Sequence, residues 1–203
     1  MSSSENARLA EQVRECTTRI HESGTAALAG LFDLTSDRLV RLAVTITKNQ
    51  HDAEDAVQSA LVRVATHTHL LCKSNEPWFY ILRIVRNEAL AILRKRKRSI
   101  ILNSIADLIT QRFVDQLEQE ESHQAIWIAL RKLPAKQSEV VVLKIWEELT
   151  FAEIGQVLGI SPATAASRYR YALEKLSKSL SVSTAVQKKQ PLPVAVGIPG
   201  GAQ

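Results

Sequence analysis

The chain has 203 residues, which is enough for one ordinary domain or two small ones. Hydrophobic residues make up 45% of it, as in a globular protein with a core, whereas aromatic residues (5%) and seven glycines are few for a β-sandwich or barrel. The net charge of +5 and the isoelectric point of about 9.4 are compatible with a nucleic acid, with an anionic membrane surface, or with neither as partner. Composition therefore favours helices and leaves the partner open.

The two cysteines, Cys16 and Cys72, are far apart and show no metal-ligand spacing, which predicts reduced thiols in a cytoplasmic protein. The first residues lack a basic stretch followed by an apolar core, so no signal peptide is expected. No apolar run approaches the ~20 residues that span a bilayer. We therefore expect a cytoplasmic chain without membrane attachment, metal or cofactor.

The chain divides into five parts. The first carries Leu9, Val13, Cys16 and Ile20 at helical spacing and ends at Gly24. The last is rich in proline and glycine without a helical period, which predicts disorder. In order, the parts are an N-terminal helical extension (1–24), a first helical module (25–98), a linker (99–121), a second helical module (122–180) and a disordered tail (181–203). The predicted fold class is all-α, with two small helical domains joined by the linker.

The linker carries many apolar residues, among them Ile101, Leu108 and Phe113, which is unlike a solvated tether. Two explanations remain open from the sequence. The segment forms a helix that packs on one module, or it docks into a partner.

A helix-turn-helix is predicted from Thr150 to about Leu176. Thr150 and Glu153 have the spacing of a capping box, and Gly159 suits the left-handed conformation that ends a helix. Ser161 is a good cap for a second helix, and Pro162 fits its first position. The alternative is two ordinary capped helices in a bundle. The short first helix and three-residue turn favour the DNA-binding motif.

The second helix of this motif has two distinct faces. At about 100° per residue, its buried face comprises Ala165, Tyr169, Ala172 and Leu176. Recognition helices present exposed residues near their N-terminus to base edges and phosphates. The residues predicted to contact DNA are Ala163, Thr164, Ala166, Ser167, Arg168, Arg170 and Tyr171. Ser167 and Arg170 are the leading candidates, because arginine often reads guanine.

Two helices of the first module carry further signals. The helix that opens with Asp52 has an apolar face running from Ala53 to Val64 and an opposite polar face. A later helix begins near Pro77 with three aromatic residues, and between Arg83 and Arg98 it carries seven basic residues and one acidic residue. A charge run is usually a solvated helix end. Aromatic rings combined with basic side chains also suit unpaired DNA, since rings stack on bases and cations follow phosphates.

With these features together, the sequence resembles the extracytoplasmic-function (ECF) group of bacterial RNA polymerase sigma factors. The resemblance covers both modules, and its specificity comes from the order and spacing of four stretches. These are DAEDAVQSALVRV (52–64), WFYILRIVRNEALAILRKRKR (78–98), LRKLPAKQSEVVVLKIWEELTFAEIGQVLGIS (130–161) and PATAASRYRYALEKL (162–176).

The resemblance implies a binding protein that recruits core RNA polymerase to promoters and promotes DNA melting. The first module would contact the clamp helices of the largest polymerase subunit through Asp55, Gln58, Ser59 and Val62. Its loop and following helix would hold the melted strand of the downstream element through Lys73, Ser74, Asn75, Trp78, Arg83, Arg86 and Asn87. The second module would read the upstream element and meet the polymerase flap. An anti-sigma factor is a candidate further partner.

The sequence argues against two other classes of function. A stand-alone helix-turn-helix regulator would need the second module but not residues 52–98. An enzyme is disfavoured, because the sequence offers no catalytic residues: it has no nucleophile–base pair, metal cluster or phosphate loop, and His67 and His69 point to different sides of a helix.

Overall fold

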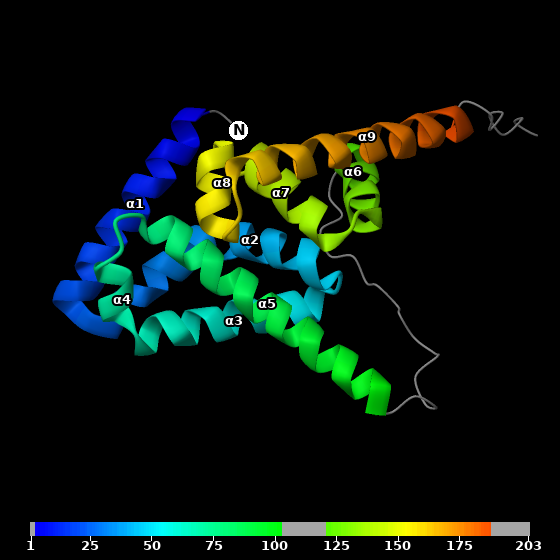
Figure 1. Cartoon of the computed structure of the whole chain (residues 1–203). Coiled ribbons are helices and arrows are strands. Elements are labelled where there is room, and N and C mark those ends of the chain that lie inside the picture. Colours follow the sequence, from blue (N-terminus) through cyan, green and yellow to red (C-terminus); the bar gives the residue numbers. More distant parts are fainter. Residues whose placement is uncertain (1–2, 103–120, 188–203) are drawn as a thin grey trace, which may run out of the picture.

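The computed structural model describes residues 3–102 and 121–187, and within these ranges every regular element is a helix (Figure 1). The elements are α1 (Ser3–Ser23), the 3-10 helix η1 (Gly24–Ala27), α2 (Leu28–Thr47), α3 (Gln50–Thr66), α4 (Thr68–Cys72), α5 (Pro77–Leu102), α6 (Glu121–Lys132), α7 (Ala135–Ile145), α8 (Phe151–Leu158) and α9 (Pro162–Gln187). The all-α prediction is confirmed. None of the described helices is both long and apolar enough to cross a membrane.

The first module is built from α2, α3 and α5, which pack against one another, with α1 and α4 at one end (Figure 1). The stripe predicted on α1 is buried in this core, and Gly24 follows it with φ 68°. On α3 the predicted apolar face is buried, apart from half-buried Leu61. The helix begins at Gln50, two residues before the predicted start, because the Asn49 side chain accepts a hydrogen bond from the Asp52 amide and caps it.

The second module contains α6 to α9. A small cluster joins α6, α7 and α9 through Leu130, Val141 and Ala172, beside the stacked rings of Trp127 and Trp146. Helix α9 extends to Gln187, seven residues beyond the predicted boundary at 180. The remaining tail (188–203) and most of the linker (103–120) lie outside the described residues. The two explanations for the linker therefore both stay open.

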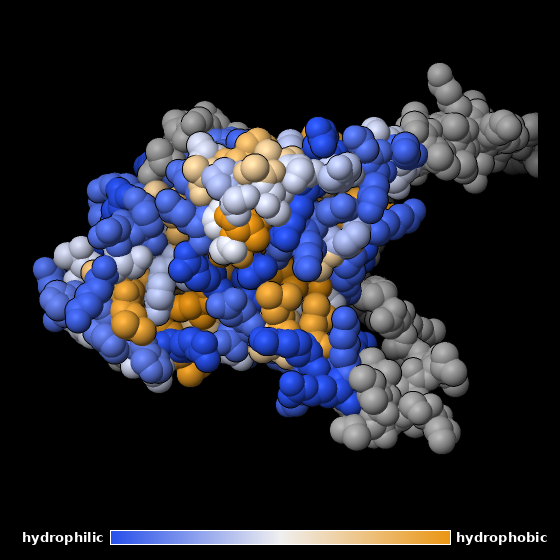
Figure 2. Space-filling model, viewed as in Figure 1, coloured by the Kyte–Doolittle hydropathy of each residue, from blue (hydrophilic) through white to orange (hydrophobic). Residues whose placement is uncertain are grey.

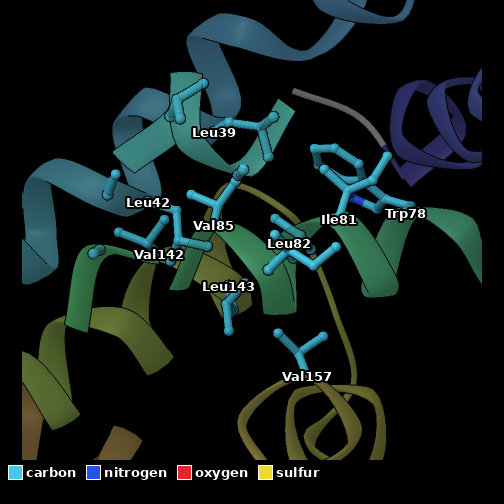
Figure 3. Packing of buried hydrophobic residues seen from close by; sticks show 14 of the residues in the cluster. Leu39, Leu42, Trp78, Ile81, Leu82, Val85, Val142, Leu143 and Val157 are labelled. Carbon is cyan, nitrogen blue, oxygen red and sulfur yellow. The ribbon is translucent and has the colours of Figure 1, made fainter. Parts of the chain in front are cut away.

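The two modules share one continuous core. Buried residues of α2 and α5 contact buried residues of α7 and α8, so that no solvent layer separates the modules at this point. Figure 3 shows Leu39 and Leu42 of α2, Ile81 and Leu82 of α5, and Leu143 of α7 gathered in this region. In Figure 1, α7 and α8 lie against the first module and α9 runs along the far side. Burial of apolar surface therefore holds the modules together.

Candidate nucleic-acid and polymerase interface

The helix-turn-helix has the predicted local chemistry. The Glu153 amide donates to Thr150 Oγ1 at 3.3 Å, and the Thr150 amide donates to Glu153 Oε2 at 2.6 Å, which completes the capping box. Gly159 ends α8 in the left-handed region with φ 67°. The Thr164 amide donates to Ser161 Oγ at 3.1 Å and caps α9. These local features set where α8 begins and ends and where α9 begins.

A second glycine of this motif has a steric role that the sequence did not indicate. Gly155 is buried, and a Cβ atom at this position would lie 2.7 Å from the carbonyl oxygen of Ile160. The turn after α8 therefore folds back onto the helix at a distance that only glycine permits. This close approach positions the start of α9.

The recognition face of α9 divides into exposed and partly covered residues. Ala163, Arg170 and Tyr171 are exposed, and the Arg170 guanidinium lies 5.2 Å from the centre of the Tyr171 ring. The other predicted contacts are half-buried, and Ser167 Oγ donates to the Thr164 carbonyl at 3.0 Å. The half-buried predicted contacts are Thr164, Ala166, Ser167 and Arg168. The opposite face is buried as predicted, with Tyr169 half-buried against Phe151.

The residues predicted to face polymerase lie on one exposed side of α3. Asp55, Gln58 and Ser59 are exposed, and Val62 is 63% exposed, which is high for an aliphatic side chain. His51 Nε2 lies 3.9 Å from Asp55 Oδ2, also at the surface. Within the described part of the chain, no other helix covers this face.

The loop before α5 is tied to the N-terminal extension. Arg14 of α1 donates to both carboxylate oxygens of Glu76 at 3.0 Å. Lys73 and Asn75 are exposed and Ser74 is half-buried. The loop residues predicted to hold an unpaired base are therefore beside α1.

Helix α5 carries the remaining predicted contacts to the melted strand. Trp78 is only 4% exposed and belongs to the core, so this ring is not available to stack on a base in this arrangement. Arg83 and Asn87 are exposed, whereas Arg86 is half-buried. Figure 2 shows a strongly hydrophilic area over the C-terminal part of α5, where the basic run 94–98 lies.

Both arginines of this set contact the second module. Arg86 Nε lies 2.9 Å from Glu139 Oε2 of α7, and Glu139 Oε1 lies 3.8 Å from Arg168 Nη1 of α9. Arg83 donates to the carbonyl of Gln156 in α8. Arg86, which is predicted to bind the melted strand, and Arg168, which is predicted to bind the upstream element, thus share the carboxylate of Glu139.

A second buried carboxylate lies between α2 and the end of α7. Arg38 Nη1 donates to Glu147 Oε2 at 3.0 Å, and also to Asn6 Oδ1 of α1 at 2.6 Å. Burial raises the pKa of Glu147, and this effect outweighs the opposing influence of Arg38, Arg41 and a hydrogen bond from Trp78. Burial also lowers the pKa of Lys48, whose ammonium donates to the carbonyls of Arg131 and Leu133.

Sequence reasoning did not identify Arg38, Lys48, Glu139 or Glu147. One local signal was present: Glu139 directly precedes the apolar run Val140–Leu143, and a carboxylate at the start of such a run is a candidate for a buried ion pair. The partners of these residues could not be inferred, because they lie far away in the sequence and most belong to the other module.

Comparisons with known proteins agree with this organisation. Residues 31–99 match the family Sigma-70 region 2, and residues 123–176 match the family Sigma-70, region 4. The ECF RNA polymerase sigma factor SigW of Bacillus subtilis (strain 168) is 27% identical over 184 residues, covering 83% of this chain and 96% of the relative. The ECF sigma factor SigE of Mycolicibacterium smegmatis is 30% identical over 152 residues, covering 72% and 58%.

Two solved structures share the fold. The sigma factor RpoE of Bartonella quintana, in complex with the anti-sigma factor NepR, superposes with a TM-score of 0.64 at 23% identity, covering 74% of this chain and 94% of that one. CnrH, in complex with the cytosolic domain of CnrY, gives 0.58 at 19% identity, covering 83% and 97%. With region 2 and region 4 present in order, and with similar ECF sigma factors over most of its length, the chain belongs to the extracytoplasmic-function group of RNA polymerase sigma factors.

Proposed function

We propose that this sigma factor recruits core RNA polymerase to promoters through two DNA elements and favours melting at the downstream one. The observation that carries the proposal is the combination, in one chain, of a helix-turn-helix with an exposed Arg170 and a first module with an exposed polymerase-facing side on α3. The chain itself catalyses no bond chemistry. It acts in the cytoplasm, where its polymerase works.

The second module reads the upstream element as duplex. Arg170 and Tyr171 supply contacts to base edges or phosphates, and the small side chain of Ala163 lets the start of α9 approach the groove. Phosphate contacts supply affinity and base contacts supply specificity. Because counterions are released, binding weakens steeply as salt increases.

The first module serves polymerase and the melted strand. Asp55, Gln58, Ser59 and Val62 form the contact with the clamp helices of the largest subunit. Lys73, Ser74 and Asn75 receive an unpaired base, and Arg83, Arg86 and Asn87 follow the strand. Capturing an unstacked base offsets a few kcal/mol of unpairing cost and so favours opening.

An anti-sigma factor is part of this proposal. RpoE of Bartonella quintana, which shares the fold, was solved in complex with the anti-sigma factor NepR, and CnrH was solved in complex with the cytosolic domain of CnrY. The exposed apolar residues of α3 and α6, namely Val62, Ile126 and Ile128, offer surface to a protein partner.

The alternative of a stand-alone regulator is not favoured, since it leaves the whole region 2 match unexplained. Reconstituted transcription distinguishes the two. Core polymerase with the purified chain is expected to initiate from a subset of promoters in a genomic library, and core polymerase alone is the control. If the chain binds duplex promoters but never supports initiation, the regulator explanation replaces the sigma factor.

A further inference from the structure

A cavity of about 300 Å³ lies between α1 and α4, beside the loop that precedes α5. In Figure 1 the C-terminal half of α1 runs alongside α4. Two threonines and a histidine of α1 form one wall, and a histidine and a thiol of α4 form the other, with a lysine of the loop beside them. These residues are Thr17, Thr18, His21, His69, Cys72 and Lys73. Because Lys73 is one of the loop residues expected to receive an unpaired base, the cavity adjoins the place where that base would lie.

The walls of this cavity are held together by bonds between α1 and the segment after α3. The Cys72 thiol donates to the Thr17 carbonyl at 3.7 Å, and the Arg14 guanidinium donates to both carboxylate oxygens of Glu76 at 3.0 Å. A preformed site of this kind binds its ligand without the cost of ordering its walls. Helix α1 thus forms one side of the cavity, although it lies outside residues 31–99 that match region 2.

The nitrogen-bearing side chains that line the cavity are those of His21, His69 and Lys73. Among the described residues that line it there is no carboxylate. Within the described part of the chain, the side chains of His21 and Lys73 make no hydrogen bond or ion pair. The Thr17 hydroxyl donates to the Val13 carbonyl of its own helix at 2.8 Å. A ligand of this cavity must therefore offer hydrogen-bond acceptors or negative charge.

A nucleotide of a single strand meets these requirements. Imidazole rings stack on unpaired bases, and a lysine ammonium binds phosphate oxygens or the keto oxygen of a base. Guanine and thymine present keto oxygens at the position where adenine presents an amino group, which needs an acceptor instead. A cavity lined by His21, His69 and Lys73 therefore favours a keto base over adenine.

We infer that α1 completes a base-selecting cavity: an unpaired base of the melted strand enters between α1 and α4, where His21 and His69 hold its ring and Lys73 binds its keto oxygen or the adjoining phosphate. This inference rests on the proposed function, to which it adds side chains of α1 as specificity-determining residues. Guanine or thymine is selected over adenine at the captured position. The N-terminal helix thus contributes to promoter choice as well as to the core, in which its apolar stripe is buried.

The first test measures base preference in the assembled polymerase. Core polymerase with the full-length chain is bound to promoters whose downstream element is a premelted bubble, and each unpaired position carries each of the four bases in turn. The lifetime of every complex is measured after a heparin challenge. At one position, wild type is expected to hold guanine or thymine about fivefold longer than adenine, and His21→Ala removes this difference. Arg19→Ala, the matched control, keeps the preference, because Arg19 is an exposed cation of α1 that lines a separate cavity toward α2.

The second test locates the base by the reactivity of the thiol in the cavity wall. Cys72 is half-buried and lines the cavity, whereas Cys16 is buried, so alkylation by iodoacetamide with readout by mass spectrometry reports on Cys72. In the complex of chain and core polymerase, a bubble with the preferred base is expected to slow this alkylation about fivefold or more. The matched control is the same bubble with an abasic site at the selected position, which leaves the strand in place and the thiol unprotected.

Two results would overturn the inference while the proposed function stands. One is a wild-type chain that supports initiation but shows the same base preferences as His21→Ala at every unpaired position. The other is equal alkylation of Cys72 with the intact and the abasic bubble. Failure of the wild-type chain to support initiation from any promoter would instead refute the proposed function.

Discussion

Helices α5 and α9 both carry arginines predicted to bind DNA, yet the fold treats them differently. On α5, Arg83 is exposed but donates to a carbonyl of the second module, and Arg86 is half-buried against Glu139. On α9, Arg168 shares Glu139, whereas Arg170 is exposed beside Tyr171. The difference follows from what lies opposite each helix. Helix α5 packs against α8, while the outer face of α9 faces none of the described helices. Arginines with the same charge on the two helices therefore differ in how accessible they are to DNA.

The largest expected effect comes from breaking the packing that covers α5. Leu143 is fully buried in the cluster shared by both modules, so Leu143→Ala should lower the free energy of unfolding by about 2–5 kcal/mol. Val62→Ala, at an exposed position of α3, should change it by less than about 0.5 kcal/mol. Urea unfolding of the two variants measures this contrast. A near-neutral Leu143→Ala would mean that the modules do not pack in solution.

The exposed arginine of α9, Arg170, can be tested on DNA that contains the upstream element. Arg170→Ala should weaken binding to duplex containing that element by about 1–3 kcal/mol if the guanidinium contacts a base. Lys175→Ala, which removes an exposed charge from the same helix, should have a smaller effect that does not depend on sequence. Electrophoretic shifts on matched and scrambled duplexes would separate the two. An unchanged footprint for Arg170→Ala would exclude this contact.

The side of α3 that is proposed to contact polymerase gives a smaller predicted effect. Asp55→Lys reverses a charge on an exposed helix face and should reduce affinity for core polymerase about tenfold, because rim charges act mainly on association. Glu22→Lys on α1 makes the same charge change elsewhere on the surface and should leave binding unchanged. Co-purification with core polymerase measures both. The assignment of α3 fails if the two variants bind equally well.

The smallest effect concerns pH. Burial in the folded chain raises the pKa of Glu147 above its ordinary value of 4.5. Arg38 and Arg41 of α2 and Trp78 of α5 face this carboxyl and oppose the rise. A carboxyl with a raised pKa binds protons more tightly when folded, so its contribution to stability falls as pH rises from 4.5 through the folded pKa. Glu147→Gln should remove this part of the pH dependence in urea unfolding. Identical slopes for wild type and variant would contradict it.

Much of the local structure was predictable. The cap at Thr150, the stop at Gly159 and the start at Pro162 depend on side chains within a few residues of the backbone groups they satisfy. The end of α9 was not predictable in this way, since no glycine or proline marks it and the helix continues to Gln187. The start of α3 was missed by two residues because Asn49, rather than Asp52, is its cap.

The candidate site was predictable only as a set of residues on helix faces. The exposed face of α3 and the buried face of α9 follow from spacing along a single helix. Trp78 differs, because the sequence showed an aromatic cluster but not which ring enters the core. That choice depends on the neighbours of α5 in space.

By itself, the sequence determined the helices, the helix-turn-helix and the sigma-factor pattern of two modules. Only the tertiary structure decided that the modules share a core and that Glu139 lies between Arg86 and Arg168. The physical reason is the separation along the sequence between the residues that interact. Caps and helical faces are set by residues three or four positions apart, whereas Arg38 and Glu147 are separated by 109 positions. Pairing at that distance depends on which apolar faces pack together, and no local pattern encodes it.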